Sequence, residues 1–165
     1  ALVGITAPYI STINSSGVVA VSTPDKEITD IDIDRAIESA RAISLPSATE
    51  IIHVTPRQFI VAGQEGIIDT IGMAGSRLEV ETKIVIGTFP AIKNLNRCIK
   101  EIGGVEMQLL VYSGFAVAET VLSETEKELG VILVDIGGTV TSITIFIESS
   151  PCFVKVIPVG SKNSH

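Results

Sequence analysis

One short stretch, residues 135–141, has the residue types and spacing of a phosphate-binding turn. The adjacent glycines Gly137 and Gly138 permit backbone conformations closed to other residues and let N–H groups approach a ligand without a Cβ in the way. Successive N–H groups in such a turn form a concavity that binds anions. Asp135, just before the glycines, would hold Mg²⁺ or an ordered water, because Mg²⁺ usually keeps several waters. An ordinary hairpin with a Gly-Gly turn stays open as the alternative.

Apolar runs on both sides of this turn predict a strand, a tight turn and a second strand. Residues 131–134 form a near-continuous apolar run, which is typical of a strand buried on both faces. In the second strand, residues 141–147, Ile143, Ile145 and Ile147 share one face. A polar stretch at residues 123–128 precedes the hairpin, and residues 152–158 predict a last strand.

The bulk composition narrows the classes of function. The chain has 165 residues, which suits one domain or two small ones, and because it begins at Ala1 we expect it to be part of a longer protein. The net charge is −7 and the twelve Lys and Arg residues are dispersed, so no nucleic-acid partner is expected, since binding a phosphate backbone needs clustered cations. The mean hydropathy is +0.47, yet no apolar run approaches the ~18 residues of a membrane span. Cys98 and Cys152 are expected to be buried reduced thiols, which favours the cytoplasm.

Residues 29–112 predict a compact α/β unit of their own, in the order helix, strand, strand, helix, strand. The five carboxylates between Asp25 and Asp34 lack the glycine of a calcium loop, and they fit a helix that begins after Thr29. Pro90 begins the second helix, which ends at Gly103 and Gly104. Its predicted inner face comprises Ile92, Leu95, Cys98, Ile99 and Ile102. We expect both helices to pack on one face of a small sheet.

The sheet of this unit is predicted from shorter patterns. Residues 78–86 alternate apolar and charged side chains. This pattern predicts a strand with one solvent-exposed face, formed by Glu79, Glu81 and Lys83. Residues 10–21 predict two short extended pieces around a turn at 14–17. Residues 51–54 and 59–61 predict either a strand pair or one strand broken at Pro56. His53 is expected to be structural, since no second ligand lies at metal-binding spacing. A third helix is predicted over residues 114–122 with Ser113 as its cap.

The residues also carry a family resemblance. Residues 135–146, Asp-Ile-Gly-Gly-Thr-Val-Thr-Ser-Ile-Thr-Ile-Phe, resemble the second phosphate motif of the actin/Hsp70/sugar-kinase superfamily. Further stretches resemble the bacterial actin-like cell-division family FtsA, namely 14–21, 51–54, 63–67, 72–80, 119–130 and 156–160. The resemblance covers nearly the whole chain. It implies an α/β fragment of an actin-like (ribonuclease H-like) ATPase fold.

The resemblance also implies a domain organisation. Residues 1–7 would be the tail of subdomain 1A, and residues 8–108 would be the inserted small α/β subdomain 1C. Residues 109–128 would be a connecting helix and loop, and residues 129–165 the start of subdomain 2A with the phosphate-type hairpin.

By the same resemblance, ATP and Mg would be the cofactors of the full-length protein. The cofactor-binding residues would be Asp135, Gly137, Gly138, Thr139 and Thr141. The chain departs from the family motif at Thr139, where a third glycine is usual, at Ser142, where an acidic residue is usual, and at Ser161, where a glycine is usual. A β-branched residue disfavours positive φ and crowds the turn, so we expect this fragment to bind no nucleotide tightly.

The implied function is structural and not enzymatic. The family anchors the division ring protein FtsZ to the inner face of the cytoplasmic membrane and recruits later division proteins. This piece would supply mainly self-association and partner binding, and the membrane helix would lie C-terminal to it. The alternatives are an actin-like pilus-assembly protein and an ATP-dependent kinase or chaperone of the same superfamily.

Overall fold

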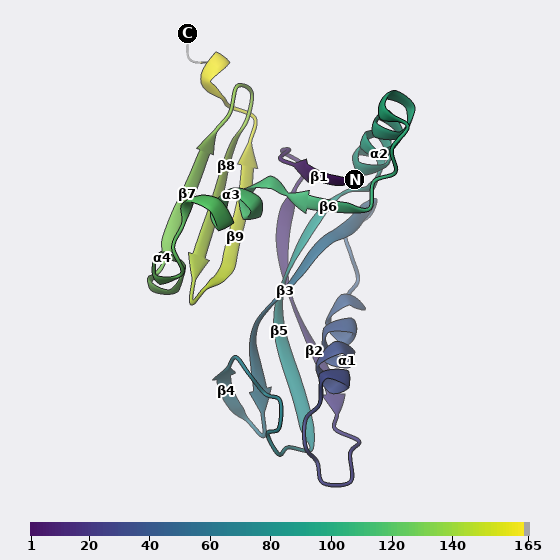
Figure 1. The fold of residues 1–165 in the computed structure, drawn as a ribbon, viewed down its shortest axis with the longest axis vertical. Helices are drawn as coiled ribbons and strands as arrows, with labels where there is room; N and C mark the ends of the chain where they lie inside the picture. Colours follow the sequence, from purple (N-terminus) through teal and green to yellow (C-terminus); the bar gives the residue numbers. More distant parts are fainter. Residues whose placement is uncertain (164–165) are drawn as a thin grey trace. The chain divides into compact units, whose positions relative to one another are not determined.

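The computed structural model describes residues 1–163, which form a mixed α/β fold (Figure 1). The chain divides into two compact units. The first unit comprises residues 1–12, 45–53 and 85 onward, and the second comprises residues 13–44 and 54–84. Strands β2, β3 and β5 contribute residues to both. This division follows compactness alone, so the subdomain boundaries predicted at residues 8, 109 and 129 stay predictions.

The second unit is built on a four-stranded sheet in the order β2-β5-β3-β4. Its strands are β2 (Ser11–Ala20), β3 (Thr49–Val61), β4 (Gln64–Ile67) and β5 (Arg77–Thr88), and its helix is α1 (Asp30–Arg41). The core contains Val21, Ile28, Ala36, Ala40, Phe59, Val61, Leu78 and Val80. Apolar side chains of α1 therefore pack on apolar positions of β3 and β5.

Helix α1 begins where the sequence predicts. Both the backbone N–H and the hydroxyl of Thr29 donate to Asp32 Oδ2, at 3.2 and 2.8 Å. Asp32 is only 2 % exposed, and Arg35 lies 3.3 Å from its other oxygen. The buried carboxylate is thus fully used at the helix start, as in a capping box. Within residues 1–163 no group of three or more potential metal ligands is present.

Strand β2 corrects the prediction of a turn at residues 14–17, because it runs unbroken from Ser11 to Ala20. Gly17 allows the backbone of α1 to approach β2 closely. A Cβ on Gly17 would lie 2.0 Å from the Ala36 carbonyl oxygen and 2.5 Å from the Ala40 nitrogen. Ser15 Oγ donates to the Ala40 carbonyl at 2.7 Å. The polar Asn-Ser-Ser-Gly sequence therefore lets the backbone of α1 pack closely on β2.

Strand β3 is likewise continuous, so the predicted break at Pro56 is wrong. Proline is tolerated in a strand where the neighbouring edge is unpaired. Strand β4 pairs with β3 only at Phe59 and Val61, so Pro56 lies beyond the reach of that ladder.

Strand β5 has the predicted alternation only in its first half. Glu79 and Glu81 are half-buried, but Lys83 is 8 % exposed and donates to Asn14 Oδ1. From Thr82 to Gly87 every residue is buried. The predicted solvent-exposed face is therefore absent from the second half of β5, where Val85 joins the core of the first unit.

In the first unit, β1 (Leu2–Ile5) pairs in parallel with β6 (Leu109–Tyr112), and α2 (Phe89–Gly103) ends at Gly104 with φ +60°. The predicted inner face of α2 is wrong in its last turns. Ile92 is buried, whereas Ile102 is 88 % exposed and Cys98 is exposed. Cys152 is half-buried, and both thiols are free. The helix extends past the elements that cover its start, so periodicity alone overestimated its buried face.

His53 has the structural role predicted for it. Its Nε2 accepts the backbone N–H of Tyr112 at 3.0 Å, and its ring lies 5.4 Å from that of Phe115. Burial lowers the pKa of His53, which favours the neutral ring that this acceptor role requires.

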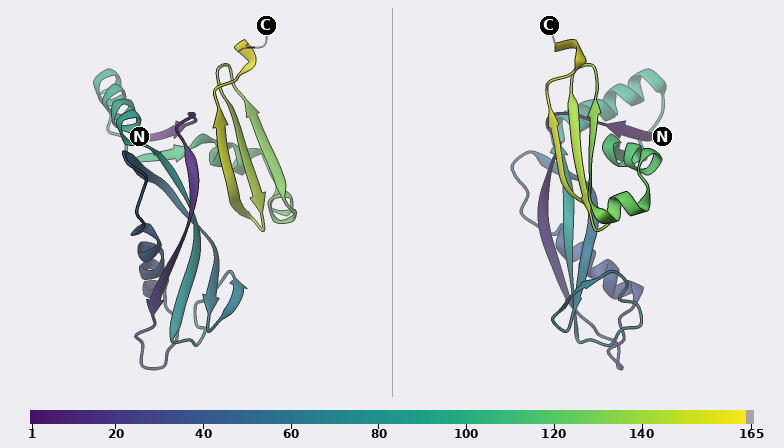
Figure 2. Two further views of the ribbon diagram at one scale, coloured as in Figure 1. Left: turned by 180° about the vertical axis from the view of Figure 1, so that it is seen from behind. Right: turned by 90° about the vertical axis from the view of Figure 1, so that its left-hand side faces the viewer.

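The rest of the first unit is a three-stranded antiparallel sheet with two short helices. Helices α3 (Ser113–Val121) and α4 (Glu124–Leu129) precede strands β7 (Val131–Ile136), β8 (Thr141–Ile147) and β9 (Ser150–Ile157). Figure 2 shows α3 beside this sheet. Tyr112, and not Ser113, is the N-cap of α3. The prediction of a polar stretch at 123–128 missed α4, although Ser123 and Glu126 have capping-box spacing.

Candidate phosphate-binding turn

The β7–β8 hairpin is positioned by the buried face of β8, which is not the predicted one. Ser142, Thr144 and Phe146 are buried, while Ile143 and Ile145 are half-buried and Ile147 is exposed. Tyr112 supplies the reason, because its hydroxyl lies 3.1 Å from Thr144 Oγ1 and so satisfies a buried polar group.

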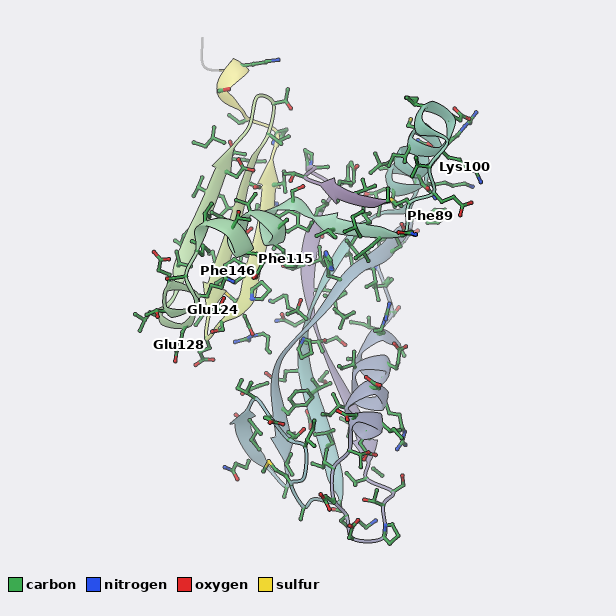
Figure 3. The ribbon with its side chains drawn as sticks, in the orientation of Figure 1. Phe89, Lys100, Phe115, Glu124, Glu128 and Phe146 are labelled. Atoms are coloured by element: carbon green, nitrogen blue, oxygen red, sulfur yellow. The ribbon has the colours of Figure 1, made fainter. Side chains whose placement is uncertain are left out.

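Aromatic packing completes the same contact. The Phe115 ring on α3 lies 5.2 Å from Tyr112 and 6.4 Å from Phe146, edge to face in both cases, and Phe115 and Phe146 are labelled in Figure 3. Gly114 is part of this packing, because a Cβ there would lie 2.4 Å from the Tyr112 ring.

Strand β7 is an edge strand of this sheet, so the prediction of burial on both faces is wrong. Ile132, Val134 and Ile136 are 62 %, 51 % and 66 % exposed. In register they pair with the half-buried Ile145, Ile143 and Thr141 of β8, respectively. Helix α3 lies on the other face, where Leu133 is paired with Thr144.

The hairpin turn itself comprises residues 137–140. Ile136 and Thr141 form the last strand pair, and the Gly137 N–H donates to the Val140 carbonyl at 2.9 Å. Neither glycine has positive φ, and nor has Thr139. The expectation that the glycines are needed for left-handed backbone is therefore wrong, and Thr139 fits the turn without such strain.

The segment after β9 lies against this turn, and Gly160 of that segment is the glycine that the close approach requires. Ser161 N–H donates to the Gly137 carbonyl at 2.9 Å, and Lys162 N–H donates to the Gly138 carbonyl at 3.0 Å. A Cβ on Gly160 would lie 2.5–2.6 Å from backbone atoms of residues 137–139. Residues 137–140 and 160–162 thus form one two-layered loop at the end of the hairpin.

The structure brings the five predicted site residues to this end of the sheet, with different surroundings. Asp135 is exposed and lies opposite Ser142 in register. Thr141 Oγ1 donates to the Val159 carbonyl at 2.7 Å, which leaves its oxygen only as an acceptor. Within residues 1–163 the N–H groups of Gly138 and Thr139 donate to no protein acceptor.

Sequence reasoning missed Lys162. A Cβ on Gly138 would meet its side chain at 3.5–3.9 Å, so a cation lies beside the turn. Among the described residues Lys162 forms no ion pair. Only the register of β9 could have placed it there, because it lies 24 positions from Gly138 in sequence.

These groups fit a phosphate, and they supply one ligand for a metal. Unpaired N–H groups and a lysine are suited to phosphate oxygens. Mg²⁺ is commonly held by one or two carboxylates together with waters and phosphate oxygens, so Asp135 alone is compatible with it.

Comparison with known proteins covers both units. Residues 8–86 match the family described as "SHS2 domain inserted in FTSA". The cell division protein FtsA of Bacillus subtilis is 40 % identical over 163 residues, which is 99 % of this chain and 37 % of that protein. FtsA of Pseudomonas aeruginosa is 37 % identical over 160 residues, covering 97 % of this chain and 38 % of that protein. The chain belongs to the FtsA family. It spans little more than a third of the length of these relatives.

A solved structure agrees on the fold. The "PilM-PilN type IV pilus biogenesis complex" contains a chain of which 41 % is matched by 93 % of this chain, with TM-score 0.54 and 16 % identity. Together with the SHS2 match, it confirms the predicted actin-like α/β fold. Among residues 1–163 of this FtsA-family chain, no helix is long and apolar enough to cross a membrane.

Proposed function

We propose that this chain is the self-association and partner-binding part of a cell-division protein that links the division ring to the membrane. In that protein it would help to anchor FtsZ at the inner face of the cytoplasmic membrane and to recruit later division proteins. The membrane contact itself would come from another part of the polypeptide. The similarity to proteins named cell division protein FtsA carries this proposal, because it extends over both units and not only over the glycine turn.

The role we propose is structural and not catalytic. The turn at 137–140 would hold phosphates of Mg-ATP from one side, through the N–H groups of Gly138 and Thr139 and through Lys162. Bound ATP would then hold the parts of the full-length protein together. His53, which could serve as a general base elsewhere, is engaged with the Tyr112 N–H. The other histidine, His165, lies outside the described residues.

A segment exchange tests the proposal. This chain would replace the 163 matched residues of FtsA in B. subtilis cells that have no other FtsA, and septa would be counted by microscopy. We expect the chimera to locate to the division ring and to support septation. The matched control carries the equivalent segment of P. aeruginosa FtsA, which has a similar identity to this chain. If the control chimera divides, and this one is stable but absent from the ring, the proposal is wrong.

A further inference from the structure

His53 connects strand β3 with the start of helix α3 in the first unit. Its Nε2 accepts the backbone N–H of Tyr112 at 3.0 Å, and its ring lies 5.4 Å from the ring of Phe115. Tyr112 is the last residue of β6 and the N-cap of α3. The imidazole therefore satisfies a backbone donor at the point where β6 ends and α3 begins.

The contacts of Tyr112 and Phe115 continue to strand β8. The Tyr112 side chain is fully buried, and its hydroxyl lies 3.1 Å from Thr144 Oγ1. The Phe115 ring lies 6.4 Å from that of Phe146, and both phenylalanines are labelled in Figure 3. Because β8 begins directly after the turn at 137–140, His53 is linked to the hairpin through these two pairs of contacts.

The hydrogen bond to Tyr112 requires a neutral imidazole. A ring nitrogen that accepts a hydrogen bond carries no proton, so the proton of neutral His53 is on Nδ1. In the imidazolium both nitrogens are donors. Protonation of His53 therefore leaves the N–H of Tyr112 without its acceptor, which is costly because Tyr112 is buried.

The charged groups on α3, β1 and β6 do not stabilise a protonated ring. Helix α3 has one charged residue, Glu119, which is paired with Lys127 at 2.8 Å. Strands β1 and β6 carry no charged side chain, and the titratable hydroxyl of Tyr112 is engaged by Thr144. Burial, and not a neighbouring charge, lowers the pKa of His53.

The charged residues of the neighbouring strand β5 lie on the other face of the sheet. A Cβ on Gly87 would meet the Ile52 side chain, so odd-numbered residues of β5 share a face with even-numbered residues of β3. All the charged residues of β5 have odd numbers, namely Arg77, Glu79, Glu81 and Lys83. On β3 itself, Glu50 is on that other face, and Arg57 is about 13 Å along the strand from His53.

The direction of the pKa shift determines the pH range in which the contact is lost. Histidine has a pKa of 6.5 in the unfolded chain, and the pKa of His53 is lower in the folded chain. Below pH 6.5 the unfolded chain therefore binds more protons than the folded chain. The stability that neutral His53 contributes is present in full above this pH and is lost as the pH falls toward the folded pKa.

We propose that His53 is a pH-sensitive latch, which holds α3 and β8 to β3 while its ring is neutral and releases them when its ring is protonated. Mild acid then loosens the β7–β9 sheet. The core around α1 stays intact, since none of the latch residues belongs to it. This inference goes beyond the proposed function and does not depend on it.

NMR on the full 165-residue chain, labelled with ¹⁵N, tests the latch. The ring nitrogens of His53 and the backbone N–H of Tyr112 are followed from about pH 7.5 to about pH 5. We expect the neutral ring to carry its proton on Nδ1, and the Tyr112 resonance to move with the same midpoint as the ring. Corrected for the intrinsic rate, amide exchange at Thr144 should become roughly five-fold faster in acid, while exchange at Ala36 of α1 should not change.

Substitutions at position 53 separate the latch from a purely structural role. His53→Gln places an amide oxygen where Nε2 accepts and does not titrate, so exchange at Thr144 should stay slow and lose its response to acid. His53→Leu removes the acceptor, and exchange there should be fast at every pH. The matched control is His165→Gln at the other histidine, which should keep the response of the unmodified chain. A Tyr112 resonance that does not follow the His53 ring, or an equal acid response in His53→Gln, overturns the proposal.

Discussion

Gly17 and Gly160 have the same role, since each lets one backbone lie against another. Neither has the positive φ that is the usual reason for glycine in a turn. At Gly17 the neighbour is the backbone of α1, and at Gly160 it is the backbone of residues 137–139. A backbone neighbour cannot move aside as a flexible side chain can, so these positions admit no Cβ.

Gly17→Ala should therefore destabilise the chain strongly. The added methyl would lie 2.0 Å from the Ala36 carbonyl oxygen, and α1 must move away from β2 to accept it. We expect a loss of about 3 kcal/mol in the free energy of unfolding, at the upper end for overpacking. For a chain of this size that corresponds to a fall of roughly 6–12 °C in Tm, measured by circular dichroism.

The matched control is Gly103→Ala at the end of α2. Gly103 has no positive φ, and the nearest atom to a Cβ there is 3.6 Å away. The same methyl should leave Tm unchanged or raise it slightly, because alanine favours a helix. Equal Tm values for the two variants would show that the close contact at Gly17 is not rigid.

At the scale of elements, the hairpin and the segment after β9 act together. Val159, Gly160, Ser161 and Lys162 are bonded to or packed against the turn at 137–140 and Thr141. The phosphate-type motif therefore comprises two stretches of sequence. In the function proposed above, its free N–H groups and Lys162 would offer one side of a phosphate site, and tight binding would need donors on the other side as well.

We predict that this chain by itself binds Mg-ATP weakly. Calorimetry at micromolar protein should show no heat, because the described residues would supply only one side of the proposed phosphate site. Lys162→Gln should weaken the remaining millimolar affinity, followed by NMR shifts of Gly138, by about five-fold, or ~1 kcal/mol. Lys155→Gln is the control, since Lys155 is paired in register with Ile143, away from the turn. A dissociation constant in the low micromolar range would contradict the prediction.

At the scale of the whole molecule, the described surface includes an open edge and an open apolar face on the β7–β9 sheet. Strand β7 has no partner beyond β8 among residues 1–163, and its run from Val131 to Val134 carries no charge. Long uncharged edges pair readily with another chain. Exposed apolar residues of β7 extend the same surface.

We expect the isolated chain to associate with a second copy through this edge. Light scattering over a dilution series should show a mass that falls toward the monomer as the concentration falls. Ile132→Lys places a charge on β7 and should make the chain monomeric throughout. Ile102→Lys makes the same change at an exposed position of α2 and should leave association intact. A monomer at every concentration for the unmodified chain would rule out this contact.

Local signals in the sequence determined several elements. The start of α1 at Thr29 and Asp32, the end of α2 at Gly104, and the hairpin around residues 137–140 were all predicted. Each depends on contacts within about four residues, so the signal and its effect lie in the same window. The FtsA-family motifs could be recognised in the sequence because each of them is also a short local stretch.

The tertiary structure determined the features that depend on residues distant in the sequence. Gly17 lies in a strand and not in a turn because α1, some 20 residues later, packs on it. The polar face of β8 is buried because Tyr112 offers Thr144 a partner, and Lys162 lies beside the turn because β9 returns there. Which face of a strand is buried, and which glycine admits no Cβ, depends on neighbours distant in sequence, since burial is a property of the packed chain and not of the local pattern.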